Sequence, residues 1–105
     1  MLAIYQGETL VIEHDVVDEF GVAKSLTGAT AYLFYREDGE TTVYDKECTI
    51  TGNTVSITLT ATDTLSLLGN YLYELKIKYT TNVVETLKQD RLFVAESLSP
   101  EFPSV

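Results

Sequence analysis

Hydrophobic and polar residues alternate along almost the whole chain. In the segment GNYLYELKIKY, every second position from Tyr71 to Tyr79 is aromatic or aliphatic. The segment NTVSITLT has the same period from Val55 to Leu59. Because neighbouring side chains of a β-strand point to opposite faces, this period predicts half-buried strands. Alternating runs of this kind occupy residues 8–17, 28–36, 44–52, 53–60, 69–79 and 83–96.

The segments between these runs carry the residues that turns require. DEFG, EDGE, TGN and TTN supply the Gly, Asn and Asp that favour hairpin turns. One segment, TATDTLSLLG, predicts a single helical turn that Thr62 or Asp63 caps and Gly69 ends. In the last run the alternation changes phase near Gln89 and Asp90, which predicts a β-bulge inside one long final strand.

These runs predict an all-β, immunoglobulin-like antiparallel sandwich. We count about seven strands joined by turns about every 8 to 12 residues, without the alternation of strands and helices that a parallel sheet needs. Residues 1–96 are expected to form this one domain. Residues 97–105 contain two prolines and are expected to be a tail that is exposed or bound to a partner.

The net charge of the chain argues against two classes of binding partner. Sixteen acidic residues against seven basic ones give a net charge of −9 over 105 residues. Such a chain repels nucleic-acid phosphates and anionic membranes, and its basic residues are scattered along the sequence, so we expect neither nucleic acid nor a membrane as partner. The segment MLAIYQGETL lacks a basic start and is interrupted by Glu8, so no signal peptide is expected.

Residues with catalytic or metal-binding chemistry are few. His14 is flanked by Glu13 and Asp15, but strand neighbours point to opposite faces, so we expect a half-buried, hydrogen-bonded histidine. Cys48, the only cysteine, is expected to be a small buried hydrophobe. The acidic turns REDGE and DVVDEFG do not match an EF-hand loop, and calcium binding there is left open. The sequence therefore predicts no enzyme, no cofactor and no metal site.

Tyr71 has a structural interpretation. It follows Gly69 and Asn70 at the beginning of a strand, the position of the tyrosine corner in immunoglobulin-type sandwiches. A buried tyrosine combines a large apolar ring with a hydroxyl that needs a partner. We therefore expect the tyrosines of residues 69–79 to fill the core, with Tyr71 at the corner.

Three longer stretches resemble a known family. They are GETLVIEHDVVDEFGVAKSLTGATAYLFYREDGE, CTITGNTVSITLTATDTLSLLGNYLYELKI and VETLKQDRLFV, and the most specific part is the segment LTGAT, residues 26–30. Together they resemble the small immunoglobulin-like domains of tailed bacteriophages, which include the N-terminal domain of upper baseplate proteins and related tail or capsid accessory proteins. The resemblance covers the chain from about Ile4 to Glu96.

The resemblance implies a non-enzymatic structural or accessory protein of a phage or prophage particle. Such a protein is made in the host cytoplasm, resides in the virion, and contacts other virion proteins and copies of itself. The candidate contact residues are Tyr32, Phe34, Leu72 and Phe102. The alternative hypothesis is a carbohydrate- or host-receptor-binding module, in which Tyr32, Phe34 and Tyr35 form an aromatic platform beside acidic loops.

Overall fold

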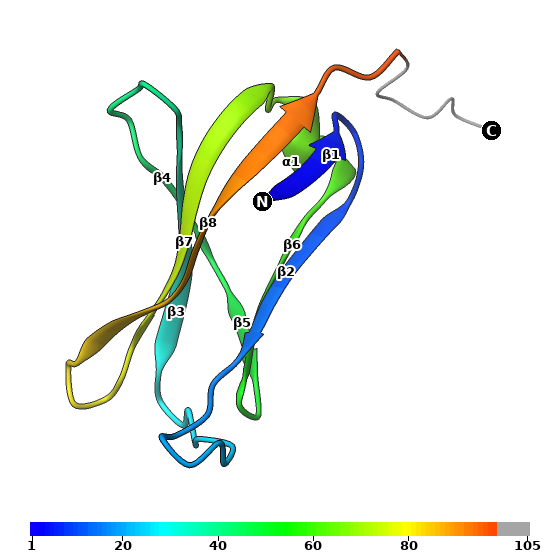
Figure 1. The fold of residues 1–105 in the computed structure, drawn as a ribbon. Helices are drawn as coiled ribbons and strands as arrows, with labels where there is room; N and C mark the ends of the chain where they lie inside the picture. Colours follow the sequence, from blue (N-terminus) through cyan, green and yellow to red (C-terminus); the bar gives the residue numbers. More distant parts are fainter. Residues whose placement is uncertain (99–105) are drawn as a thin grey trace.

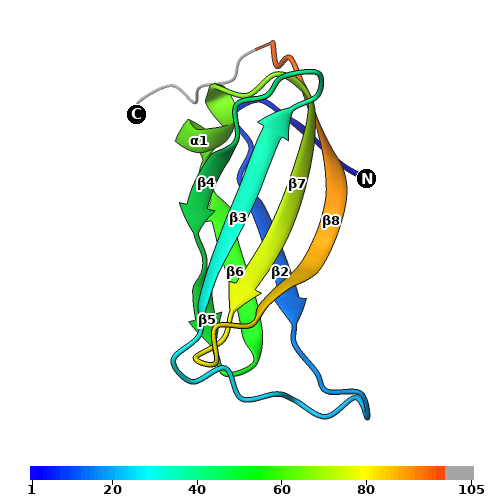
Figure 2. The same cartoon turned by 90° about the vertical axis from the view of Figure 1, so that its left-hand side faces the viewer.

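The computed structural model describes residues 1–98 as two β-sheets that pack against each other (Figure 1). One sheet has five strands in the order β1-β8-β7-β3-β4, and the other has three in the order β2-β6-β5. Figure 2 shows β3, β7 and β8 side by side in the larger sheet. The elements are β1 (Leu2–Tyr5), β2 (Leu10–Asp15), β3 (Thr30–Glu37), β4 (Tyr44–Glu47), β5 (Thr49–Thr51), β6 (Thr54–Leu59), α1 (Ala61–Leu65), β7 (Gly69–Lys78) and β8 (Val84–Ala95). The predicted all-β sandwich is confirmed, with eight strands in the described residues.

The core lies between the sheets and is built from the inward positions of the alternating runs. On β7, every second residue from Tyr71 to Ile77 is at most 6 % exposed. The alternate positions of β6, Val55 to Leu59, belong to the same buried cluster. The alternation therefore identified the buried face of these strands, because a period of two fixes which side chains share a face.

The strand β1 was not predicted, and it makes the one parallel pairing in this part of the chain. It runs beside β8, with Leu2 opposite Leu92 and Tyr5 opposite Ala95. Four residues are too short a run for the alternation to indicate a strand. The turn after β1 is held by Thr64, which is fully buried: its hydroxyl donates to the carbonyl of Glu8 at 2.7 Å and accepts from the N–H of Gly7 at 3.1 Å.

The run at residues 44–52 was predicted as one strand, and this is wrong. Strand β4 pairs with β3 in the larger sheet, whereas β5 pairs with β6 in the smaller one. Cys48 lies at the crossing and is 9 % exposed, and its N–H donates to the carbonyl of Ala31 at 2.9 Å. Alternation continues through the crossing, so the sequence pattern contains no break at the point where the chain changes sheets.

The β-bulge of β8 lies earlier than predicted. Leu75 is opposite Lys88 and Lys76 is opposite Thr86, so Leu87 is the extra residue. Gln89 and Asp90 pair regularly with β7. The apolar residues Leu87 and Leu92 are five positions apart, so they show that the phase changes between them but not where. The residues between them, Lys88 to Arg91, are all polar, so they do not show where the phase changes.

The helix α1 begins earlier than predicted. Its N-cap is Thr60, whose hydroxyl accepts from the N–H of Asp63 at 3.2 Å, while the Asp63 carboxylate accepts from the N–H of Thr60 at 2.8 Å. This reciprocal pair is a capping box, so Asp63 occupies the third helical position and is not the cap. Gly69, predicted to end the helix, instead begins β7 with a φ of +98°.

A side-chain bond joins the helix to the edge of the larger sheet. The ammonium group of Lys46 on β4 donates to the carboxylate of Asp63. This bond and the capping bond to Thr60 hold the pKa of Asp63 below its ordinary value. The ionised form of Asp63 therefore stabilises the fold at neutral pH.

Candidate interaction surface

Tyr71 forms the hydrogen bond expected of a tyrosine corner. Its hydroxyl accepts from the N–H of Leu68 at 3.1 Å, three residues upstream. Its ring is 6 % exposed and lies edge-on to the ring of Tyr35, with 6.5 Å between centroids. The bond ties the segment after α1 to the beginning of β7, so Tyr71 has a structural position and not a position on an open surface.

The outward side chains of β3 and β7 form a strip on the solvent side of the larger sheet. Tyr32 is opposite Lys76 and Phe34 is opposite Glu74, and the next outward pair joins β3 to Leu72. The rings of Tyr32 and Phe34 are 6.0 Å apart between centroids and tilted by 33°. We call Tyr32, Phe34 and Leu72 the outer strip. Leu72 and Phe34 were expected to be exposed, and both are half-buried.

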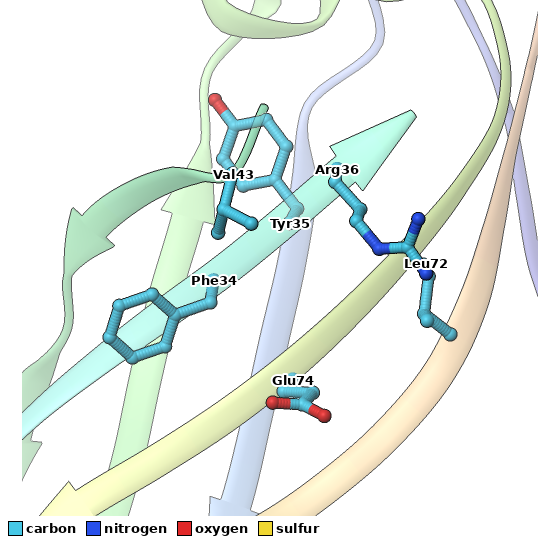
Figure 3. Close-up of a pocket in the computed structure, with 6 residues that line it drawn as sticks. All are labelled: Phe34, Tyr35, Arg36, Val43, Leu72 and Glu74. Atoms are coloured by element: carbon cyan, nitrogen blue, oxygen red, sulfur yellow. The ribbon is translucent and has the colours of Figure 1, made fainter. Parts of the chain in front are cut away.

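Two shallow hollows flank Phe34 on this face. The upper hollow, of about 120 Å³, lies between β3 and β7. Figure 3 shows Phe34 and Arg36 on β3 and Leu72 and Glu74 on β7 around it. We call the second hollow the lower groove; its volume is about 230 Å³, and its side chains are mostly apolar with a rim of two lysines. The groove is lined by Thr30, Tyr32, Phe34, Lys76, Ile77, Lys78 and Val84.

Basic residues that are scattered along the sequence meet on this face. Arg36, Lys76, Lys78 and Arg91 all occupy outward positions of β3, β7 and β8, and they are four of the seven basic residues of the chain. Two have carboxylate partners: Lys76 lies 3.6 Å from Glu74, and Arg91 lies 3.3 Å from Asp38. This gathering contradicts the expectation of scattered basic residues, because it depends on the pairing of strands that are far apart in the chain.

Tyr35 does not join the aromatic platform that the sequence predicted with Tyr32 and Phe34. Its ring stacks on Tyr44 at 5.6 Å between centroids and is close to Tyr71, on the side of β3 that faces the core. Burial raises the pKa of Tyr35, and nearby Asp63 adds to the effect. Adjacent residues of a strand point to opposite faces, so the ring of Tyr35 lies away from that of Phe34, although Tyr35 also borders the upper hollow.

His14 and Cys48, the two residues considered for catalysis, do not form a site together. His14 is half-buried on β2 opposite Val55, with Glu13 and Asp15 exposed on the other face. The half-buried position of His14 is as expected, and its expected hydrogen bond stays a prediction. Cys48 is buried, and this burial raises the pKa of its thiol to about 11, with a further contribution from Glu47. A thiol with such a pKa is largely protonated and a poor nucleophile at neutral pH.

Neither a cluster of metal-binding side chains nor a membrane-spanning helix is found among the described residues. Within residues 1–98, no three His, Cys, Asp or Glu side chains come together in a way that would hold a metal ion. No helix in that part of the chain has the length and apolar content needed to cross a membrane. The candidate contact residue Phe102 lies outside the described residues, as does most of the predicted tail.

Comparisons with known proteins add information on the fold. No family model matches the chain, and no curated protein matches it. Among solved structures, the chain is similar to part of a protein described as a "putative glycoside hydrolase from Bacteroides vulgatus ATCC 8482", with a TM-score of 0.60 and 9 % sequence identity. The similarity covers 92 % of this chain and only 17 % of that one. At this identity it supports the β-sandwich fold alone.

Proposed function

We propose that this chain is a non-enzymatic structural or accessory protein of a phage particle, in the tail, the baseplate or the capsid, and that the outer strip binds another virion protein. The resemblance of LTGAT and its flanking stretches to phage immunoglobulin-like domains supports the virion role. The outer strip is the observation that carries the binding role. It places two aromatic rings and a leucine on a sheet face where an ordinary solvated strand would present polar residues.

The chemistry of the outer strip suits a protein partner. Interface hot spots are typically aromatic residues and arginines, surrounded by polar groups that exclude water. Tyr32, Phe34 and Arg36 alternate along one face of β3, with Leu72 opposite Arg36. A partner that covers the upper hollow would bury Phe34 and Leu72 together and would meet the cations of Arg36 and Arg91 at the rim.

The test is binding of the purified chain to the shell, tail and baseplate proteins of the same particle, followed by light scattering during size-exclusion chromatography. We expect a complex with one of them, and we expect Leu72→Asp to weaken it about tenfold or more because a charge is then buried at the contact. Val11→Asp is the matched control, because Val11 is 53 % exposed on the outward face of the smaller sheet. A complex equally sensitive to Val11→Asp, or absent with every virion protein, contradicts the proposal.

A second candidate is binding of a carbohydrate or host receptor, and the paired rings of Tyr32 and Phe34 favour it. Their centroids are 6.0 Å apart and Lys76 and Glu74 lie opposite them, so apolar faces and hydrogen-bonding groups adjoin. This candidate predicts that the isolated chain binds host-surface glycans and that Phe34→Ala removes the binding. A screen of diverse glycans without any bound member would count against it.

A further inference from the structure

A short hairpin with exposed apolar side chains extends from the end of the sandwich. Figure 2 shows the connection from β2 to β3 reaching beyond the end of both sheets. We call residues 16–24 of this connection the finger. Within it, Val17 and Ala23 form an isolated antiparallel bridge, and the N–H of Lys24 donates to the carbonyl of Val16 at 3.0 Å. The finger is therefore a small hairpin with its own hydrogen bonds.

Hydrogen bonds fix the turn at the tip of the finger, where the side chain of Phe20 is exposed to solvent. The Asp18 carboxylate accepts hydrogen bonds from the N–H groups of Phe20 at 2.8 Å and Val22 at 3.0 Å. Gly21, with a φ of +78°, gives the turn its left-handed residue. The side chain of Phe20 is 82 % exposed, and Val17 and Val22 are at least half exposed. An ordered loop that exposes an aromatic ring loses little conformational entropy on binding, which favours an intermolecular role.

The lower groove fits this tip in size. A cavity of about 150 Å³ is enough to hold a benzene ring. The lower groove has a volume of about 230 Å³ and is walled by Tyr32, Phe34 and Val84, so a phenyl ring fits within it. The high exposure of Phe20 shows that its own groove does not hold it.

The charges of the two surfaces are complementary. Asp18 and Glu19 precede Phe20 at the tip of the finger, whereas Lys76 and Lys78 form the rim of the lower groove. Lys78 makes no ion pair with any described carboxylate. Because the chain carries a net charge of −9, two copies repel each other unless an acidic segment of one meets a basic rim of the other.

We propose that the occupant of the lower groove is the finger of a second copy of this chain, with Phe20 between the aromatic walls and Glu19 beside Lys78. Reciprocal insertion gives a two-fold pair, and insertion in one direction gives a ring or a filament. The inference deepens the proposed function and rests on it only for the use of the same sheet face. Phe34 lines both hollows, so its ring would be shared, whereas Arg36, Leu72 and Glu74 of the upper hollow stay available for a different virion protein.

The test is sedimentation equilibrium of the full purified chain from micromolar to millimolar concentration. We expect the mass to increase with concentration and Phe20→Ala to weaken association about tenfold or more, as the loss of an aromatic anchor does. Glu19→Lys and Lys78→Glu are each expected to weaken association, and the two together to restore it. Val11→Ala, a loss of an exposed apolar side chain on the other sheet, is the control and is expected to change nothing.

Each contrary outcome overturns the inference. A chain that stays monomeric throughout, or a Phe20→Ala variant that associates like the parent, removes the finger as the occupant. Association that is lost on deletion of residues 99–105 but kept in Phe20→Ala assigns the groove to that segment instead. Because the assay uses the chain alone, its failure leaves binding to other virion proteins intact. Conversely, a self-associating chain that binds no virion protein contradicts the proposed function only.

Discussion

The hydroxyl groups of two neighbouring core tyrosines are expected to have different effects on stability. Tyr71 and Tyr73 lie on the same face of β7 and are 6 % and 1 % exposed. The Tyr71 hydroxyl accepts from the N–H of Leu68, whereas the Tyr73 hydroxyl is buried without a hydrogen-bond partner among the described residues. The substitutions Tyr71→Phe and Tyr73→Phe remove the same atom and keep both rings, so each serves as the control for the other.

The expected change in the free energy of unfolding depends on which polar groups each substitution leaves without a partner. Tyr71→Phe leaves the N–H of Leu68 without its acceptor, and a buried donor without a partner costs about 1 to 3 kcal/mol. That N–H is only partly buried, so we expect the lower part of this range, about 1 to 2 kcal/mol. For a domain of this size, the loss corresponds to a Tm lower by roughly 4 to 16 °C. Tyr73→Phe removes a hydroxyl that is desolvated without a protein partner, so we expect a change within about 0.5 kcal/mol or a gain.

The assay is denaturant unfolding of the parent and both variants, with the slope of free energy against denaturant checked for constancy. Calorimetry gives the corresponding Tm values. Two results contradict these expectations: Tyr73→Phe loses as much free energy of unfolding as Tyr71→Phe, or Tyr71→Phe changes nothing. The first result would mean that the hydroxyl of Tyr73 is satisfied by a bound water, and the second that the corner bond is not stabilising.

Three other properties of the fold are open to direct measurement. Thr64→Val leaves two backbone groups of the turn after β1 without partners, so we expect a loss of about 2 to 3 kcal/mol in urea unfolding; Ser66→Ala, at the exposed end of α1, is the control. Cys48, with a pKa raised to about 11, is expected to react with a thiol reagent at pH 8 only as fast as the protein unfolds, and rapid labelling of the native chain would contradict its burial. The pKa of Asp63 is lowered by its bonds to Lys46 and Thr60, so its contribution is complete above the unfolded pKa of about 3.9 and is lost as the pH falls through the folded value. Asp63→Asn is therefore expected to destabilise the domain at pH 7 and to differ less from the parent at pH 3; an equal difference at both would refute this assignment.

The sequence determined the class of the fold and the buried faces of β6 and β7. A period of two is a local property, so Tyr71, Leu75 and Val55 could be assigned to the core without knowledge of their neighbours. The position of Tyr71 after Gly69 and Asn70 likewise predicted a corner tyrosine, because the corner is formed by residues close in the chain. The helix was predicted with its cap at Thr62 or Asp63, whereas Thr60 and Asp63, which have the spacing of a capping box in the sequence, form the cap.

Only the tertiary structure decided how the strands meet. The crossing of the chain at Cys48 from one sheet to the other depends on hydrogen-bond register, and so does the exact place of the bulge at Leu87; hydrophobic alternation indicated a bulge but not its position. The same holds for the surface: Phe34 lies beside Glu74, and Lys76 beside Tyr32, across about forty intervening residues of chain. The outer strip, the lower groove and its basic rim are therefore products of strand pairing, because they join side chains that no local pattern connects.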